Sequence, residues 1–124
     1  MDNQSSCSCS GGPKLIFACS GAADVGEISD RAARKMSREG TGRMFCMAGI
    51  GGRVPGIMKT TEAAADILAI DGCNLDCTRK SLEEVGFKQF QHLQLSKLGM
   101  EKGKTAPTDE NIDMVVARGK EMLI

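Results

Sequence analysis

Residues 64–77 read AADILAIDGCNLDC, and this stretch decides the fold that we expect. Its first part, 64–70, is a short apolar run of the kind that forms a strand inside a sheet. The sequence Asp-Gly-Cys at 71–73 breaks the run, and a helix is predicted to follow over 75–85, where Gly86 ends it. A buried strand that turns directly into a helix is the repeating unit of a parallel sheet.

The same unit recurs along the rest of the chain. The predicted strands are 14–18, 43–48, 64–70 and 89–95, and the predicted helices are 24–39, 55–63, 75–85 and an amphipathic segment after Thr108. Asp24 is expected to cap the first helix, Gly40 to end it and Thr108 to cap the last. We therefore expect an α/β fold: a small three-layer sandwich with a mostly parallel four-stranded sheet, Rossmann-like or flavodoxin-like, in the strand order 2-1-3-4.

The length of 124 residues suits one domain. Residues 1–13 are rich in Ser and Gly and are predicted to form a flexible tail, so the single α/β domain should span 14–124. Two cysteines, Cys7 and Cys9, fall in this tail. A Cys-x-Cys pair there could bind metal, pass metal on, cover another site or have no role.

The formal charges balance, with 16 basic and 16 acidic residues, which argues against a broad nucleic-acid-binding surface. There is no Trp or Tyr and there are only 4 Phe, so aromatic platforms for stacking bases are not expected either. No apolar run approaches the roughly 20 residues that span a bilayer, and the N-terminus lacks the apolar stretch of a secretion signal. We therefore expect no nucleic acid or membrane as partner, and a cytoplasmic protein whose cysteines stay reduced.

Three evenly spaced cysteines each follow or end a predicted strand: Cys19, Cys46 and Cys73. In an open parallel sheet the carboxyl ends of all strands lie along one edge, where such folds bind ligands. Neighbouring strands are about 4.8 Å apart, so the predicted order would bring these three thiols together. Cys77 lies one helical turn after Cys73 and would add a fourth sulfur from the first turn of the third helix.

Four thiols in this arrangement are typical of tetrahedral zinc, with Zn–S bonds of about 2.3 Å. Helices are predicted to begin just after Cys19 and Cys73, and the partial positive charge of a helix N-terminus favours the thiolate. Glycines in the nearby turns let peptide N–H groups approach sulfur, and Asp71 is expected to orient its loop or to support the ligands. Cys19, Cys46, Cys73 and Cys77 are thus the predicted metal ligands, although a free cysteine is often only a small buried apolar side chain.

Three segments, CSGAADVGEISDRAAR, MFCMAGIGG and IDGCNLDCTRKSLEEVG, occur in this order and together resemble the DGC-domain family. The family takes its name from the Asp-Gly-Cys motif, here at 71–73, and the resemblance covers the chain from about Lys14 to the C-terminus. Members of the family are described as zinc-binding, so the resemblance implies that the same four cysteines form the metal site. It implies no particular reaction.

The function that we expect first is a structural or sensory zinc site, because four thiolates leave no open position for a hydrolytic water. The alternative is a thiol redox protein or an iron–sulfur electron carrier, since sulfur ligands alone do not separate zinc from iron. A phosphatase-like reaction at Cys19 is disfavoured, because Val25 stands where a phosphate cradle needs Arg, beside the acidic Asp24 and Glu27. The single histidine, His92, is expected to be a half-buried strand residue away from the cysteine loops, and an enzyme is less expected than a binding protein.

Overall fold

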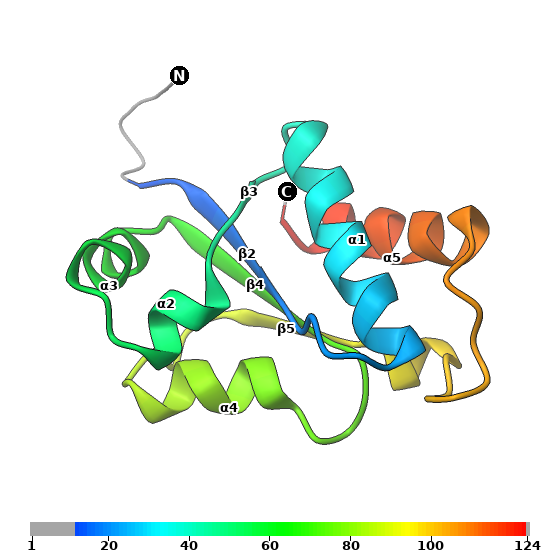
Figure 1. The fold of residues 1–124 in the computed structure, drawn as a ribbon. Coiled ribbons are helices and arrows are strands. Elements are labelled where there is room, and N and C mark those ends of the chain that lie inside the picture. The colour runs from blue at the N-terminus through cyan, green and yellow to red at the C-terminus, as the bar shows by residue number, and fades with distance from the viewer. Residues whose placement is uncertain (1–11, 124) are drawn as a thin grey trace.

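The structure is a computed structural model of the chain and describes residues 12–123, so Cys7 and Cys9 lie outside the described residues. Within this range the sheet has four strands, β2 (Lys14–Ala18), β3 (Arg43–Met44), β4 (Asp66–Asp71) and β5 (Gln91–Gln94). All neighbouring strands are parallel, and they lie in the order β3-β2-β4-β5 (Figure 1). The predicted order, with the first strand between the second and the third, is confirmed.

Helices cover both faces of the sheet and complete the three layers (Figure 1). One face is covered by α1 (Asp24–Arg38) and α5 (Asp109–Met122), and the other by α2 (Met47–Gly51), α3 (Pro55–Glu62) and α4 (Cys77–Glu84). A short 3-10 helix, η2 (Leu95–Leu98), follows β5. The expected α/β sandwich is therefore the observed fold.

The two central strands bury the side chains of both their faces. In β2, Ile16 and Ala18 belong to the core under α1 and α5, whereas Leu15 and Phe17 belong to the core under α2, α3 and α4. β4 alternates in the same way between the two cores. A central parallel strand that is covered on both sides has a continuous apolar sequence, which is why these two strands could be predicted.

The second predicted strand, 43–48, is wrong beyond Met44. Cys46 is instead the N-cap of α2. A Cβ at Gly49 would lie only 2.2 Å from Cδ1 of Ile57 in α3, so α2 can pack against α3 because this position is glycine. The contact between two helices thus overrides the local β propensity of this stretch.

Two other helix starts differ from the predicted ones. Ala23, not Asp24, is the N-cap of α1, and Asp24 is the first residue of the helix. The helix predicted from 75 begins at Cys77. The remaining signals are confirmed, since Thr108 caps α5 through its side chain and Gly40 follows the end of α1 with a φ of 83°.

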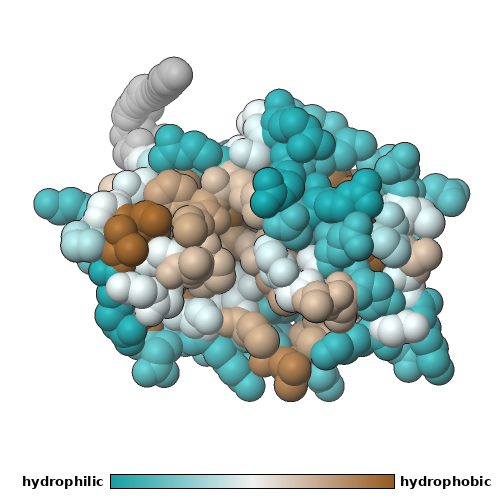
Figure 2. All heavy atoms as spheres, viewed as in Figure 1, coloured by the Kyte–Doolittle hydropathy of each residue, from teal (hydrophilic) through white to brown (hydrophobic). Residues whose placement is uncertain are grey.

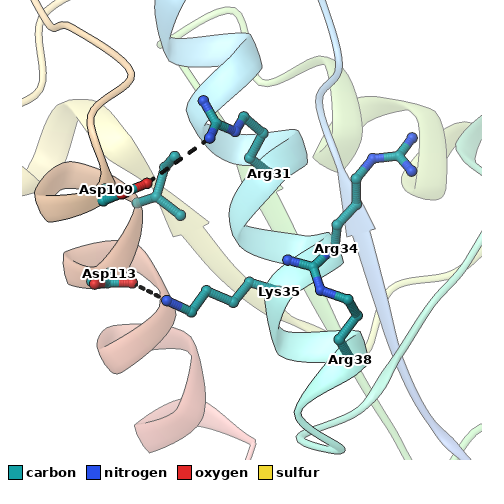
Figure 3. Close-up of a pocket in the computed structure, with 7 residues that line it drawn as sticks. Arg31, Arg34, Lys35, Arg38, Asp109 and Asp113 are labelled. Atoms are coloured by element: carbon teal, nitrogen blue, oxygen red, sulfur yellow. Dashed lines mark hydrogen bonds and ion pairs between the residues drawn. The ribbon is translucent and has the colours of Figure 1, made fainter.

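A groove of about 390 Å³ runs along the joint between α1 and α5 (Figure 3). Its lining consists of Arg31, Arg34, Lys35, Arg38, Asp109, Ile112 and Asp113. The ion pairs of its basic side chains are Arg31–Glu27, Arg31–Asp109, Arg34–Asp30 and Lys35–Asp113. Acidic partners from the same two helices neutralise most of the basic charge, so the groove is a poor site for an anion. The Arg31–Asp109 and Lys35–Asp113 pairs connect α1 to α5.

Candidate functional site

The four predicted ligands lie at the carboxyl edge of three neighbouring strands, which we call the cysteine edge. Cys19 directly follows β2, and its amide donates to the carbonyl of Ile70 in β4 at 2.9 Å. Cys46 follows β3, Cys73 follows β4, and Cys77 is the first residue of α4. The fold thus brings thiols from separate parts of the chain to one end of the sheet.

The sulfur atoms themselves do not form a closed set. Among residues 12–123, no three cysteine Sγ atoms lie within 4.8 Å of one another, whereas sulfurs around one zinc ion are about 3.8 Å apart. Cys19 and Cys73 are half-buried, and Cys46 and Cys77 are exposed. Rotation about χ1 moves each sulfur, so the backbone brings the thiols to one edge without fixing the distances between them. The four-cysteine site therefore stays a prediction.

The Asp-Gly-Cys turn is packed tightly against the first turn of α1. A Cβ at Gly72 would lie 2.9 Å from the carbonyl carbon and oxygen of Val25, so the two backbones can meet only through glycine. Gly26 makes a similar close contact with the backbone of Gly21, just after the first cysteine of the edge. Cys73 packs against the core under α1 and α5. These contacts hold the turns after β2 and β4 to the same helix end.

Asp71 is 1% exposed and caps α4 from the end of β4. Its Oδ1 accepts a hydrogen bond from the amide of Thr78 at 2.7 Å, and its Oδ2 accepts one from the amide of Arg79 at 3.0 Å. The first-turn N–H groups of a helix have no partner within the helix, and they carry the positive end of its dipole. Asp71 therefore orients the loop between β4 and α4, one of the two roles expected of it.

Asp76 immediately precedes α4 and has a left-handed backbone conformation with a φ of 55°, which costs a non-glycine residue about 1–3 kcal/mol. Its carboxylate accepts hydrogen bonds from Nε2 of Gln94 at 2.6 Å and from Nη2 of Arg79 at 2.9 Å. Burial would raise the pKa of Asp76, but the hydrogen bonds from Gln94 and Arg79 outweigh it and hold the pKa below its usual value. The charged side chain thus anchors a strained turn.

His92 is not away from the cysteine loops, and that prediction is wrong. Its Nε2 lies 2.8 Å from Oδ2 of Asp71 and 3.5 Å from Oδ1 of Asp76. Among the described residues, these three form the group of possible metal ligands whose atoms lie within 4.8 Å of one another. Part of the signal was present in the sequence, because the strand that leads into Asp71 and the strand of His92 are neighbours in the predicted order, but the register that sets Ala69 opposite His92 could not be predicted.

A third carboxylate, that of Asp24, holds a distant loop against the start of α1. Asp24 accepts hydrogen bonds from the amides of Gly103 at 2.9 Å and Thr105 at 3.0 Å, and so ties the loop after η2 to the start of α1. The amides of Gly103 and Thr105 stabilise the charged carboxylate and hold the pKa of Asp24 below its usual value. Asp24 therefore makes long-range contacts in place of the local helix cap that the sequence predicted.

We expect Asp24→Asn to destabilise the fold at neutral pH and to have little effect in acid. The asparagine oxygen can accept from one of the two loop amides, but its NH₂ group meets the other. A carboxylate whose folded-state pKa is lowered stabilises the fold above its unfolded-state pKa of about 3.9, and the contribution is lost as the pH falls through the lower folded-state value. Urea unfolding at a series of pH values should show the stability gap closing, and a constant gap would contradict this role.

The surface over α2 and α3 is less polar than that over α1 (Figure 2). Figure 2 shows apolar side chains gathered over α2 and α3, whereas polar side chains cover α1. Leu75, between two of the cysteines, is 56% exposed, and Val54, between α2 and α3, is 46% exposed. No helix among residues 12–123 combines the length and the apolar composition needed to cross a membrane.

The fold and the site together define a class of protein: an open parallel α/β sandwich whose cysteines gather at the carboxyl ends of its strands. Within that class the chain belongs to the DGC domain family, whose family model matches residues 15–118. The chain is also similar to the "Anaerobic and virulence modulator AnvM" of Pseudomonas aeruginosa, with 35% identity over 88 residues, which cover 71% of this chain and 67% of the relative. No solved structure matches the chain.

Proposed function

We propose that this protein binds zinc through Cys19, Cys46, Cys73 and Cys77, in a structural or sensory site. The observation that carries the proposal is the supply of four thiols by three neighbouring strand ends and the first turn of the next helix. Thiolate is a soft ligand that suits zinc. A cytoplasmic location, where thiols stay reduced, fits this chemistry.

The local electrostatics support metal binding by thiolates. Cys77 is the first residue of the eight-residue helix α4, and Cys19 lies in the turn that leads into α1. The N-terminus of a helix carries partial positive charge and free N–H groups, which interact favourably with an anionic ligand such as a thiolate. The exposure of Cys46 and Cys77 gives an ion access to the edge. A closed set of four thiolates would leave no site for a substrate, which favours a structural or sensory role over catalysis.

Metal analysis of protein purified without added metal tests the proposal. We expect about one zinc per chain and four thiols that are protected from alkylation until a chelator is added, as a tetrahedral four-sulfur site requires. Serine at any of the four positions should remove most of the zinc and lower the stability of the metal-loaded protein, because metal binding and folding are coupled.

The tail cysteines provide the matched control. A Cys7→Ser, Cys9→Ser double variant changes two thiols outside the described domain and should keep the metal. Zinc that survives in a Cys73→Ser variant, or zinc lost only from the tail variant, would contradict the proposed ligand set. Retention of zinc in all of these variants would place the metal elsewhere.

An iron–sulfur cluster on the same four thiols is the second candidate. The relative is named "Anaerobic and virulence modulator AnvM", and an oxygen-sensitive cluster is one chemical basis for an anaerobic modulator. Sulfur ligands do not by themselves discriminate between zinc and iron. Anaerobic purification followed by absorption spectra separates the two, because a cluster is coloured and zinc is not. A colourless anaerobic protein with stoichiometric zinc excludes the cluster.

A further inference from the structure

His92 joins the edge strand β5 to both carboxylates of the loop that carries Cys73. Its Nε2 lies 2.8 Å from Oδ2 of Asp71 at one end of this loop and 3.5 Å from Oδ1 of Asp76 at the other. The side chain of His92 is 21% exposed, and those of the two aspartates are 1% and 11% exposed. One imidazole therefore holds both ends of residues 71–76, which span the loop between β4 and α4.

The two carboxylates connect His92 to the segments that carry Cys73 and Cys77. Asp71 binds the amides of Thr78 and Arg79, which directly follow the fourth cysteine of the edge, and so fixes the start of α4. Asp76 is the residue just before that cysteine, and its side chain is held by Arg79 and by Gln94 of β5. The turn inside the loop is closed by a hydrogen bond from the amide of Asp76 to the carbonyl of Cys73 at 3.3 Å.

These three side chains are better suited to positioning than to holding a cation themselves. Both oxygens of Asp71 accept backbone amides, and the oxygens of Asp76 accept Gln94 and Arg79. A metal ion between them would have to displace hydrogen bonds that already satisfy a largely buried group, at a cost of about 1–3 kcal/mol for each unsatisfied partner. The network instead resembles the outer support that fixes metal ligands in other proteins.

We propose that Asp71, His92 and Asp76 form a latch that sets the positions of Cys73 and Cys77, with His92 as a positioning residue of the cysteine edge. The effect on metal affinity rests on the proposed zinc site, whereas the effect on the loop does not. Loss of the latch frees residues 72–76 and lets the two thiols move apart. The loop then has to become ordered when zinc binds, and the entropic cost of that ordering weakens the affinity for zinc.

Three variants test the latch. His92→Leu removes the hydrogen bond to Asp71 and the 3.5 Å contact with Asp76, whereas His92→Gln can place an amide nitrogen near the position of Nε2. Gln91→Leu changes an exposed polar residue of the same strand and serves as the matched control. Zinc affinity is measured by competition with a chromophoric chelator, at a temperature where every variant is folded. In the metal-free proteins, exchange of the Thr78 and Arg79 amides and alkylation rates of Cys73 and Cys77 are followed.

We expect His92→Leu to weaken zinc binding about 10- to 100-fold, as other losses of outer support for a metal site do. The same variant should speed exchange of the two amides and change the alkylation rates of the two thiols. His92→Gln and Gln91→Leu should stay near the wild type in all three measurements. Failure of His92→Gln to restore exchange and alkylation would overturn the hydrogen-bonding role.

Wild-type exchange and alkylation in folded His92→Leu would overturn the latch, whatever the zinc result. If the wild type binds no zinc, the proposed function fails, and exchange and alkylation in the metal-free proteins still decide whether the latch exists. If His92→Leu does not fold, Gln94→Leu takes its place, because it removes the 2.6 Å hydrogen bond to Asp76 and otherwise only the hydrogen bond that Gln94 accepts from the exposed Ser96. Faster exchange of the Arg79 amide in that variant supports the latch, and unchanged exchange overturns it.

Discussion

Replacement of Asp71 by alanine is expected to lower the free energy of unfolding by about 3–5 kcal/mol, the range seen when one partner of a buried charged network is removed. The carboxylate is 1% exposed and accepts hydrogen bonds from two amides of α4, and it also contacts His92. Alanine leaves those donors without an acceptor in a buried position. Because each unsatisfied buried donor costs about 1–3 kcal/mol, the loss is larger than that of an ordinary helix cap.

The matched control lies at the other end of the same strand. Asp66 begins β4 and is half-buried, and its Oδ1 accepts a hydrogen bond only from the amide of its neighbour Ile67. Asp66→Ala should therefore cost less than about 1 kcal/mol, as surface changes usually do. Guanidinium unfolding of both variants in metal-free buffer makes the comparison. If Asp71→Ala costs no more than Asp66→Ala, Asp71 does not hold α4 in the way its hydrogen bonds indicate.

The strand order and the layers could be predicted because they follow from features that are local in sequence. Residues 15–18 and 67–70 are apolar on both faces, and a continuous apolar run is typical of a covered central strand. Glycine and Thr108 marked helix ends through backbone rules that operate within one turn. The position of cysteines at the carboxyl edge followed in turn from the strand order.

What could not be predicted depends on contacts between distant residues. Residues 43–48 have a strand-like composition, but the last two of them belong to α2, where Ile57 packs over Gly49. Asp24 looked like a local cap, whereas its carboxylate binds a loop that lies near residue 103. In each case the side chain satisfies a partner that the neighbouring sequence does not show, which is the usual way tertiary structure overrides local preference.

The candidate site also has some features that the sequence predicts and others that depend on distant contacts. Neighbouring strands carry Cys19, Cys46 and Cys73 to one edge, and this depends only on topology. The distances between sulfurs depend on side-chain rotation and on the loop conformation. The loop conformation in turn depends on Asp71 and His92, whose pairing comes from the register of β4 against β5. Register is set by the whole sheet, so the sequence predicted where the thiols lie but not what holds them there.

Gly72→Ala is expected to lower the free energy of unfolding by about 1–3 kcal/mol, the usual cost of adding one methyl group to a packed site. The new Cβ would lie 2.9 Å from the carbonyl carbon, the carbonyl oxygen and Cγ2 of Val25. Two of these atoms belong to the backbone of the first turn of α1, which cannot rotate away as a flexible side chain could. The Asp-Gly-Cys turn must therefore move away from α1, and Cys73 moves with it. Zinc affinity should fall together with stability if the proposed site is correct.

Gly56→Ala gives a control of opposite sign. Gly56 lies in the first turn of α3, and an added Cβ would have no atom within 4 Å. Alanine there should raise the free energy of unfolding by up to about 1 kcal/mol, because it removes the conformational freedom of a helical glycine in the unfolded chain. Denaturant unfolding of the two variants should thus show shifts in opposite directions. Equal stabilisation by both would mean that the turn at 71–73 has room for a side chain, and the glycine of the motif would then need an explanation other than its contact with α1.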